Sequence, residues 1–206
     1  MKAGSVERAN AKLRKLVRDV HERVDAHHAK PAQSPPGVRC TEGCAYAPAG
    51  CCSLITLLEA SEAEYIVDRN REAVRRALPA LLDAEQRIAE ILAPDAITSM
   101  WRNRDTEQQV AQAYHEAHIV CPFLGSDRRC SIYRDRPVAC RTHFVLSPPA
   151  ECTAAGPSMK HVILDKGTRI AAQELIVRGV GYLRGELLFG TLPQLVLRAW
   201  RNKRGT

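Results

Sequence analysis

Eight cysteines arranged in two groups of four constrain the fold of this 206-residue chain more than any other feature. The first group is Cys40, Cys44, Cys51 and Cys52. The second group is Cys121, Cys130, Cys140 and Cys152. Both groups lie in irregular segments rich in glycine, proline or alanine. Because four thiolates form the ligand set of a tetrahedral zinc site or of an Fe–S cluster, the sequence predicts that all eight cysteines bind zinc or iron.

The remainder of the chain favours metal ligation over disulfide bonds. Charged residues are scattered through residues 1–16, where a secretory signal would have an apolar run. No segment approaches the roughly 18 consecutive apolar residues of a membrane-spanning helix. We therefore expect a cytoplasmic protein with no membrane span. In that reducing compartment, grouped thiols bind metals more often than they form disulfides.

Apolar residues recur at helical spacing along much of the chain outside the cysteine groups. Leu13, Val17 and Val24 belong to a stripe that predicts an amphipathic helix over residues 5–28. Residues 31–37 follow this helix as a linker that is rich in helix breakers. The N-terminal part of the chain is therefore expected to be one helix, joined by a linker to the cysteine-containing part.

The segment between the two cysteine groups has the pattern of a helical insertion, over about 62–118. Its expected helices cover 62–77, 79–93 and 106–118. Ser61 and Glu64 form a capping box at the start of the first helix. Pro79 is expected near the start of the second, because proline is favoured in a first helical turn.

The C-terminal part of the chain is also expected to be helical. Thr191 and Gln194 form a capping box ahead of apolar residues at helical spacing. The expected organisation is an N-terminal helix over 1–30, a linker over 31–37 and a cysteine-cluster domain over 38–206. The predicted fold is mainly α, with helices around an irregular cysteine-rich metal-binding core and few or no strands.

Cys51 and Cys52 are adjacent, which bears on the number of metal centres. In an extended segment successive side chains point to opposite sides. Neighbouring cysteines therefore do not easily share one ion, but each can serve a different centre, or one can bind while its neighbour packs. This pattern favours a compact two-centre site over two separate zinc knuckles, and it does not distinguish zinc from iron–sulfur.

Three histidines near the second cysteine group are the other candidate ligands. His115 and His118 form an HExH pattern, whereas the HExxH pattern of zinc proteases places its histidines one full turn apart. We expect both outside the ligand set, because eight cysteines fill two four-coordinate sites. His143, shortly after Cys140, is the alternative ligand if one cysteine does not bind.

The second cysteine group carries a longer motif, which reads CPFL from Cys121, CSIY from Cys130 and RPVACR from Arg136 to Arg141. Together with the first group, this string resembles the YkgJ family, also described as a zinc- or iron-chelating CxxCxxCC domain, over roughly residues 38–152. All eight cysteines pair with cysteines of the family pattern, although the first group is spaced C-x3-C-x6-CC rather than C-x2-C-x2-CC. The resemblance implies zinc or iron as the cofactor. Because related domains occur in flagellin lysine methylases, it also implies methyl transfer as an alternative.

The positive charge of the chain bears on its partners. A formal net charge of +7 is typical of a nucleic-acid-binding protein, but thiolates at eight metal-bound cysteines would offset part of it. The second cysteine loop contains arginines that would compensate those thiolates and lower the thiol pKa values, namely Arg128, Arg129, Arg134, Arg136 and Arg141. We therefore expect metal ions and not nucleic acid as partners, with residues 5–28 available for a protein partner or self-association.

Three functions remain open from the sequence. The first is a protein that chelates zinc or iron, including as an iron–sulfur cluster. The second is an Fe–S-dependent enzyme of redox chemistry or group transfer, although no residue pattern names its catalytic groups or a nucleotide site. The third is a zinc-stabilised adaptor for nucleic acid or protein, built on the basic helix at residues 5–28.

Overall fold

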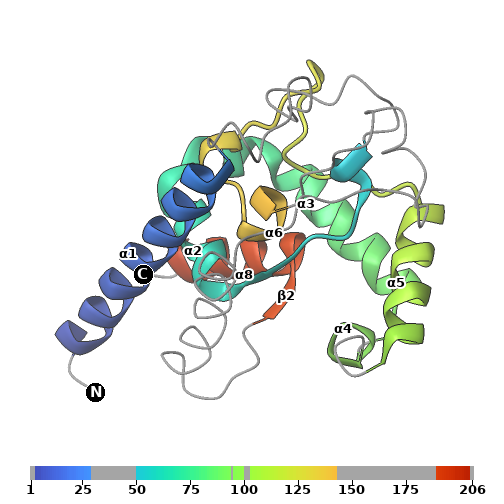
Figure 1. Ribbon diagram of the computed structural model, residues 1–206, viewed down its shortest axis with the longest axis horizontal. Helices are drawn as coiled ribbons and strands as arrows, with labels where there is room; N and C mark the ends of the chain where they lie inside the picture. The colour runs from blue at the N-terminus through green and yellow to red at the C-terminus, as the bar shows by residue number, and fades with distance from the viewer. Residues whose placement is uncertain (1–2, 29–49, 94, 100–102, 143–188, 205–206) are drawn as a thin grey trace.

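A computed structural model describes residues 3–28, 50–93, 95–99, 103–142 and 189–204 of the chain (Figure 1). Within these ranges the elements are α1 (Ala3–His28), the 3-10 turn η1 (Gly50–Ser53), β1 (Leu57–Glu59), α2 (Ala60–Arg69), α3 (Arg71–Ile91), α4 (Ala96–Ser99), α5 (Arg104–Glu116), the 3-10 turn η2 (Tyr133–Asp135), α6 (Val138–Thr142), β2 (Phe189–Thr191) and α8 (Leu192–Arg204). The prediction of a mainly helical fold with few strands is confirmed.

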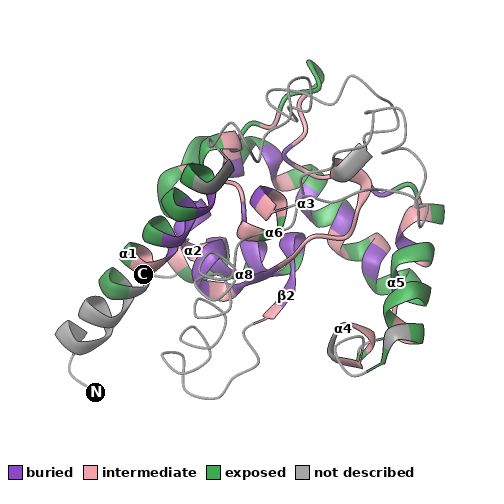
Figure 2. Cartoon of the chain, viewed as in Figure 1, coloured by how far each residue is buried: buried purple, intermediate pink, exposed green. Residues whose placement is uncertain are grey.

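Helices α2, α3 and α8 form the centre of the core. Leu58, Ile66, Leu81 and Val196 are buried in one cluster that these helices share with β1 (Figure 2). The purple, buried faces in Figure 2 are turned toward one another, and the green faces are turned outward. This is the arrangement expected of amphipathic helices around a single apolar core.

A two-stranded sheet brings together two segments that lie far apart in the sequence. β1 pairs antiparallel with β2, with Leu58 opposite Gly190. A Cβ at Gly190 would lie 3.3 Å from Cγ of the buried Leu195, so glycine lets β2 turn closely into α8. α8 begins at Leu192, directly after Thr191, as the C-terminal capping pattern predicts.

Two details of the predicted helix boundaries are wrong. Pro79 lies inside α3, and the break between α2 and α3 falls at Asn70. The reason is local, because Asn70 leaves the helical backbone conformation (φ −129°, ψ 38°) and its side-chain amide donates to the Ile66 carbonyl at the end of α2. Pro79 is exposed, so the carbonyl that lacks its helical hydrogen bond can bond water instead.

The capping box predicted at Ser61 is also wrong. α2 begins at Ala60, one residue before Ser61, because β1 leads directly into the helix. The Ser61 hydroxyl donates instead to Oε2 of Glu59, at 2.7 Å. The hydroxyl therefore satisfies a buried carboxyl group rather than a helix terminus.

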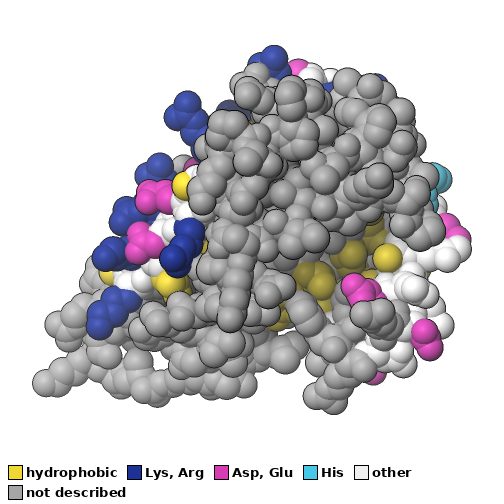
Figure 3. Space-filling view, in the orientation of Figure 1, with side chains coloured by type: hydrophobic (Ala, Val, Ile, Leu, Met, Phe, Trp, Pro, Cys, Tyr) yellow, Lys and Arg dark blue, Asp and Glu magenta, His cyan; other side chains and the backbone are white. Residues whose placement is uncertain are grey.

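The N-terminal helix α1 packs along one edge of the molecule, beside α2 and α6 (Figure 1). Val17, Val20 and Val24 are buried against Tyr65 of α2, which confirms the apolar stripe predicted over residues 5–28. Along this edge, Lys and Arg side chains alternate with Asp and Glu (Figure 3). None of the described helices is long and apolar enough to cross a bilayer.

The core assignment predicts opposite outcomes for two neighbouring leucines of α3. The Leu81 side chain is 0% exposed, whereas Leu82 is 49% exposed. Leu81→Ala should lower the free energy of unfolding by about 2–5 kcal/mol, because it leaves a cavity in the core. Leu82→Ala should change it by about 0.5 kcal/mol or less. Urea denaturation measures both, and equal losses would contradict this packing.

Candidate metal centre

The structure describes the side chains of four of the eight predicted ligands. Cys52, Cys121, Cys130 and Cys140 are all half-buried, and Cys52 and Cys130 carry free thiols. Cys51 belongs to η1, but its side chain is not described. Cys40, Cys44, Cys152 and the alternative ligand His143 lie outside the described residues. The complete ligand set therefore stays a prediction.

Two cysteine-bearing segments that are far apart in the sequence meet in the fold. The backbone N–H of Cys121 donates to the carbonyl of Cys52, with an N···O distance of 2.7 Å. Between these two residues the chain runs through β1 and helices α2 to α5. The last cysteine of the first group is thus placed beside the first cysteine of the second group.

The segment that follows Cys121 is a compact hairpin that fixes Cys130. Leu124 and Cys130 form an isolated antiparallel bridge, and the Ser131 N–H donates to the Phe123 carbonyl at 2.8 Å. Phe123 and Ile132 are both buried in the main core cluster. This hairpin therefore holds its cysteines through core packing and backbone hydrogen bonds.

Cys140 lies on the short helix α6, as expected from Pro137. The Arg141 N–H donates to the Pro137 carbonyl at 3.0 Å, so Pro137 begins the helical turn. The Thr56 hydroxyl lies 3.9 Å from Sγ of Cys140. A hydroxyl at this position can donate a hydrogen bond to a thiolate, which is a common way to support a metal-bound sulfur.

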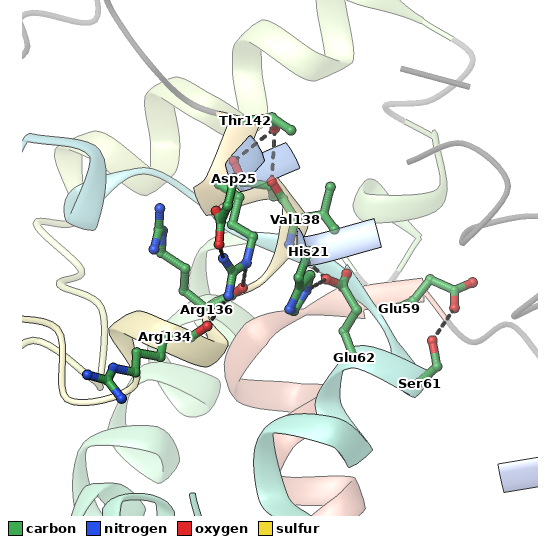
Figure 4. A network of polar contacts seen from close by, with 11 residues as sticks. His21, Asp25, Glu59, Ser61, Glu62, Arg134, Arg136, Val138 and Thr142 are labelled. Carbon is green, nitrogen blue, oxygen red and sulfur yellow. Dashed lines mark hydrogen bonds and ion pairs between the residues drawn. The ribbon is translucent and has the colours of Figure 1, made fainter. Parts of the chain in front are cut away.

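A buried polar network surrounds the helix that carries Cys140 (Figure 4). The Arg141 guanidinium donates to Asp25 of α1 and to the backbone carbonyls of Arg134 and Arg136. From the sequence Arg141 is expected to compensate thiolates, and in the structure its guanidinium pairs with an aspartate of α1. Asp25 and the other acidic residues of this network were not identified from the sequence.

A second polar contact reaches the start of the same helix (Figure 4). The Val138 N–H donates to Glu62 Oε1 at 2.7 Å, and His21 Nε2 lies 3.4 Å from the same oxygen. His21 also meets the Tyr65 ring edge-on, with 5.5 Å between ring centroids. The signal for His21 was present in the sequence, since this histidine follows Val17 by four residues on the apolar stripe.

The pKa of the Cys130 thiol is raised. Burial is the largest cause, while a backbone hydrogen bond from Ile132 and the charge of Arg136 act in the opposite direction. The expected lowering by arginine is therefore outweighed at this cysteine. Burial also raises the pKa of Tyr114, and the nearby Cys121 raises it further. A metal ion that binds these sulfurs must displace the thiol protons.

The described His, Cys, Asp and Glu side chains do not form a closed metal site by themselves. His115 and His118 lie at the end of α5, with ring centroids 6.4 Å apart. Within the described ranges, no three or more His, Cys, Asp or Glu side chains are grouped so that they could hold a metal ion. By chemistry, the donors present are sulfurs, which suit zinc or iron better than magnesium or calcium.

The fold and its donors define a mainly helical protein in which two cysteine-bearing segments are brought together by a helical frame. Residues 39–155 match the CxxCxxCC family, described as "Putative zinc- or iron-chelating domain". This match spans more than half of the chain and all eight cysteines, so the chain belongs to that family. The resemblance seen in the sequence is confirmed. No curated protein and no solved structure matches the chain.

Glu59 is a buried carboxyl group at the edge of this network. It is 1% exposed, and it accepts one hydrogen bond, from Ser61, through Oε2. Among the buried side-chain atoms of the described residues, Glu59 Oε1 and His21 Nδ1 lack a hydrogen-bond partner. Burial is the main reason that the pKa of Glu59 is raised to about 7. The hydrogen bond from Ser61 lowers this pKa, and the negative charge of Glu62 raises it.

This raised pKa predicts a specific pH dependence of stability. Between the unfolded pKa of 4.5 and about 7, the unfolded chain loses the Glu59 proton while the folded chain keeps it. Stability should therefore fall as the pH rises through this window, by about 3 kcal/mol at most. Glu59→Gln should remove that loss, so the variant should gain stability over wild type at pH 8 but not at pH 4.

Urea denaturation at both pH values measures this gain. Glu90→Gln, at an exposed position of α3, is the control and should show no such pH-dependent gain. A gain for Glu59→Gln that is the same at both pH values would contradict the buried, protonated carboxyl group.

Proposed function

We propose that this chain binds zinc or iron through two groups of four cysteines that together form a compact two-centre site. The proposed ligands are Cys40, Cys44, Cys51, Cys52, Cys121, Cys130, Cys140 and Cys152. The observation that carries this proposal is the backbone hydrogen bond from Cys121 to Cys52, since it places one cysteine of each group beside the other. The family match, which contains all eight cysteines, supports the same ligand set.

The described cysteines lie on short segments that a bound metal ion would stabilise. Cys52 lies on a short 3-10 turn, Cys130 on a hairpin and Cys140 on a helix of five residues. None of these segments is long enough to be stable by itself, because short helices and hairpins are marginal in water. A metal ion that binds several of them would hold the segments together, and its binding energy would contribute to folding.

The polar groups around the sulfurs have separate tasks in this proposal. The Thr56 hydroxyl would support the sulfur of Cys140, and Arg136 would offset negative charge beside Cys130. The half-buried position of the four described cysteines would limit water access to the metal. The metal itself would supply Lewis acidity if it is zinc, or electron transfer if it is iron–sulfur.

The proposed centres could hold either zinc or iron. Cys51 and Cys52 lie in the 3-10 turn η1 and not in the extended segment assumed from the sequence. At three residues per turn, adjacent side chains point about 120° apart, which still suits two centres in one region, as paired zinc ions or as an iron–sulfur cluster. Grouped thiols stay available to metals in a reducing compartment, so we propose a cytoplasmic location. Metal ions are its proposed partners, with α1 as the surface for a protein partner.

Elemental analysis and the absorption spectrum of anaerobically purified protein test the proposal. We expect stoichiometric zinc without colour, or iron with the broad visible absorption of an Fe–S cluster. Cys52→Ser and Cys121→Ser should each lose most of the metal at one centre, because serine replaces a soft sulfur ligand with a hydroxyl. Free energies of unfolding should fall with the metal content.

His115→Ala and His118→Ala are the matched controls, since both residues lie close to Cys121 in the sequence and are not proposed ligands. Both variants should keep the wild-type metal content. Metal-free wild-type protein from anaerobic preparation that also takes up no added zinc or iron would contradict the proposed function. Metal loss in the histidine variants, with retention in the cysteine variants, would contradict the ligand set.

A further inference from the structure

Helix α6 is too short to hold its own position, although it carries Cys140. It spans only Val138–Thr142. Isolated helices need roughly 12–15 residues to be stable in water. The position of Cys140 must therefore be fixed by contacts that α6 makes with the rest of the molecule.

One such contact is the ion pair between Arg141 and Asp25. Arg141 directly follows Cys140 and is 1% exposed, so its charge needs a partner. Asp25 of α1 accepts from Nη1, while the Arg136 carbonyl accepts from Nε at 2.9 Å. The Arg134 carbonyl accepts from Nη2. This arrangement satisfies the guanidinium from three directions and ties α6 to α1.

The position of Asp25 in α1 indicates that its negative charge stabilises the Arg141 guanidinium and does not stabilise α1 itself. α1 ends at His28, so Asp25 lies in its last turn. A negative charge in the last turn opposes the helix dipole and costs a few tenths of a kcal/mol to about 1 kcal/mol. The ion pair with Arg141 offsets this cost, because it neutralises a charge that is buried beside Cys140.

The second contact holds the other end of α6. The Val138 N–H donates to Oε1 of the buried Glu62, and His21 of α1 packs against the same oxygen at 3.4 Å (Figure 4). Val138 also packs against the cluster formed by Val17, Val20 and Val24. Both ends of α6 are therefore held by α1, directly or through Glu62, and Cys140 lies between them.

We propose that α1 is a positioning element of the metal centre, so that metal binding at Cys140 and docking of α1 are coupled. Asp25 and the His21–Glu62 pair are positioning residues in this sense, since they act on Cys140 through α6. This inference rests on the proposed function. By linkage, whatever α1 docking adds to metal affinity, metal binding adds equally to α1 docking.

Two aspartates of α1 provide a matched pair of variants. The side chains of Asp25 and Asp19 are similarly exposed, at 52% and 51%. Asp19, however, makes only a weak surface ion pair, with 4.0 Å between its Oδ1 and Nε of the exposed Arg18. Asp25→Asn should weaken zinc binding by about 5- to 20-fold, at the lower end of the range that is typical of coupled sites. Asp19→Asn should leave it within about twofold, as expected of an exposed ion pair. Competition with a chromophoric chelator measures both affinities.

Hydrogen exchange gives a second readout, which is independent of the affinity measurement. Zinc should slow amide exchange in α1 relative to the metal-free protein, and this protection should be smaller in Asp25→Asn than in Asp19→Asn. If the ion pair were merely structural, its loss would lower the free energy of unfolding equally with and without zinc. The zinc-dependent part of the α1 protection would then be unchanged.

Two negative outcomes have different meanings. Tight zinc binding by wild type, with equal affinities for the two aspartate variants and no zinc-dependent protection of α1, would overturn the coupling alone. A wild-type chain that binds neither zinc nor iron would overturn the proposed function, and the coupling with it.

Discussion

Short irregular segments carry the described cysteines, and such segments cannot fix their own geometry. A 3-10 turn, a hairpin and a five-residue helix contain too few internal hydrogen bonds to be stable by themselves. The frame formed by α1, α2, α3 and α8 supplies the missing constraints from outside. Phe123 and Ile132 anchor the hairpin in the core, and Asp25 of α1 and Glu62 of α2 hold α6.

The same arrangement explains why the molecule buries charged groups. Arg141, Glu59, Glu62 and His21 are all buried, although burial of an unpaired charge is costly. Arg141 and Glu62 are compensated by specific partners on α1 and α6. Glu59 is compensated in a different way, since its pKa of about 7 keeps the carboxyl group largely protonated below neutral pH. Arg141, Glu62 and His21 lie at the junction of α1, α2 and α6, beside the helix that carries Cys140, whereas Glu59 lies at the end of β1.

Much of the fold could be predicted from residue patterns, because those patterns are local. The apolar stripe of α1, the mainly helical class, the start of α8 after Thr191 and the turn begun by Pro137 are all confirmed. The boundary at Asn70 was missed because Pro79 is the stronger local signal, although an exposed helix face tolerates it. Asp25 and Glu62 were missed because their partners lie more than seventy residues away, and no local pattern predicts such pairs.

The central claim is that cysteines from two distant segments bind metal in one region of a helical frame. Anomalous diffraction at the zinc and iron absorption edges, from crystals of anaerobically purified protein, tests this claim most directly. The account predicts anomalous peaks at about 2.3 Å from cysteine sulfurs, with at least one peak in the region that Cys52 and Cys121 share. Disulfide bonds among the eight cysteines, or metal bound only by residues other than these cysteines, would contradict it.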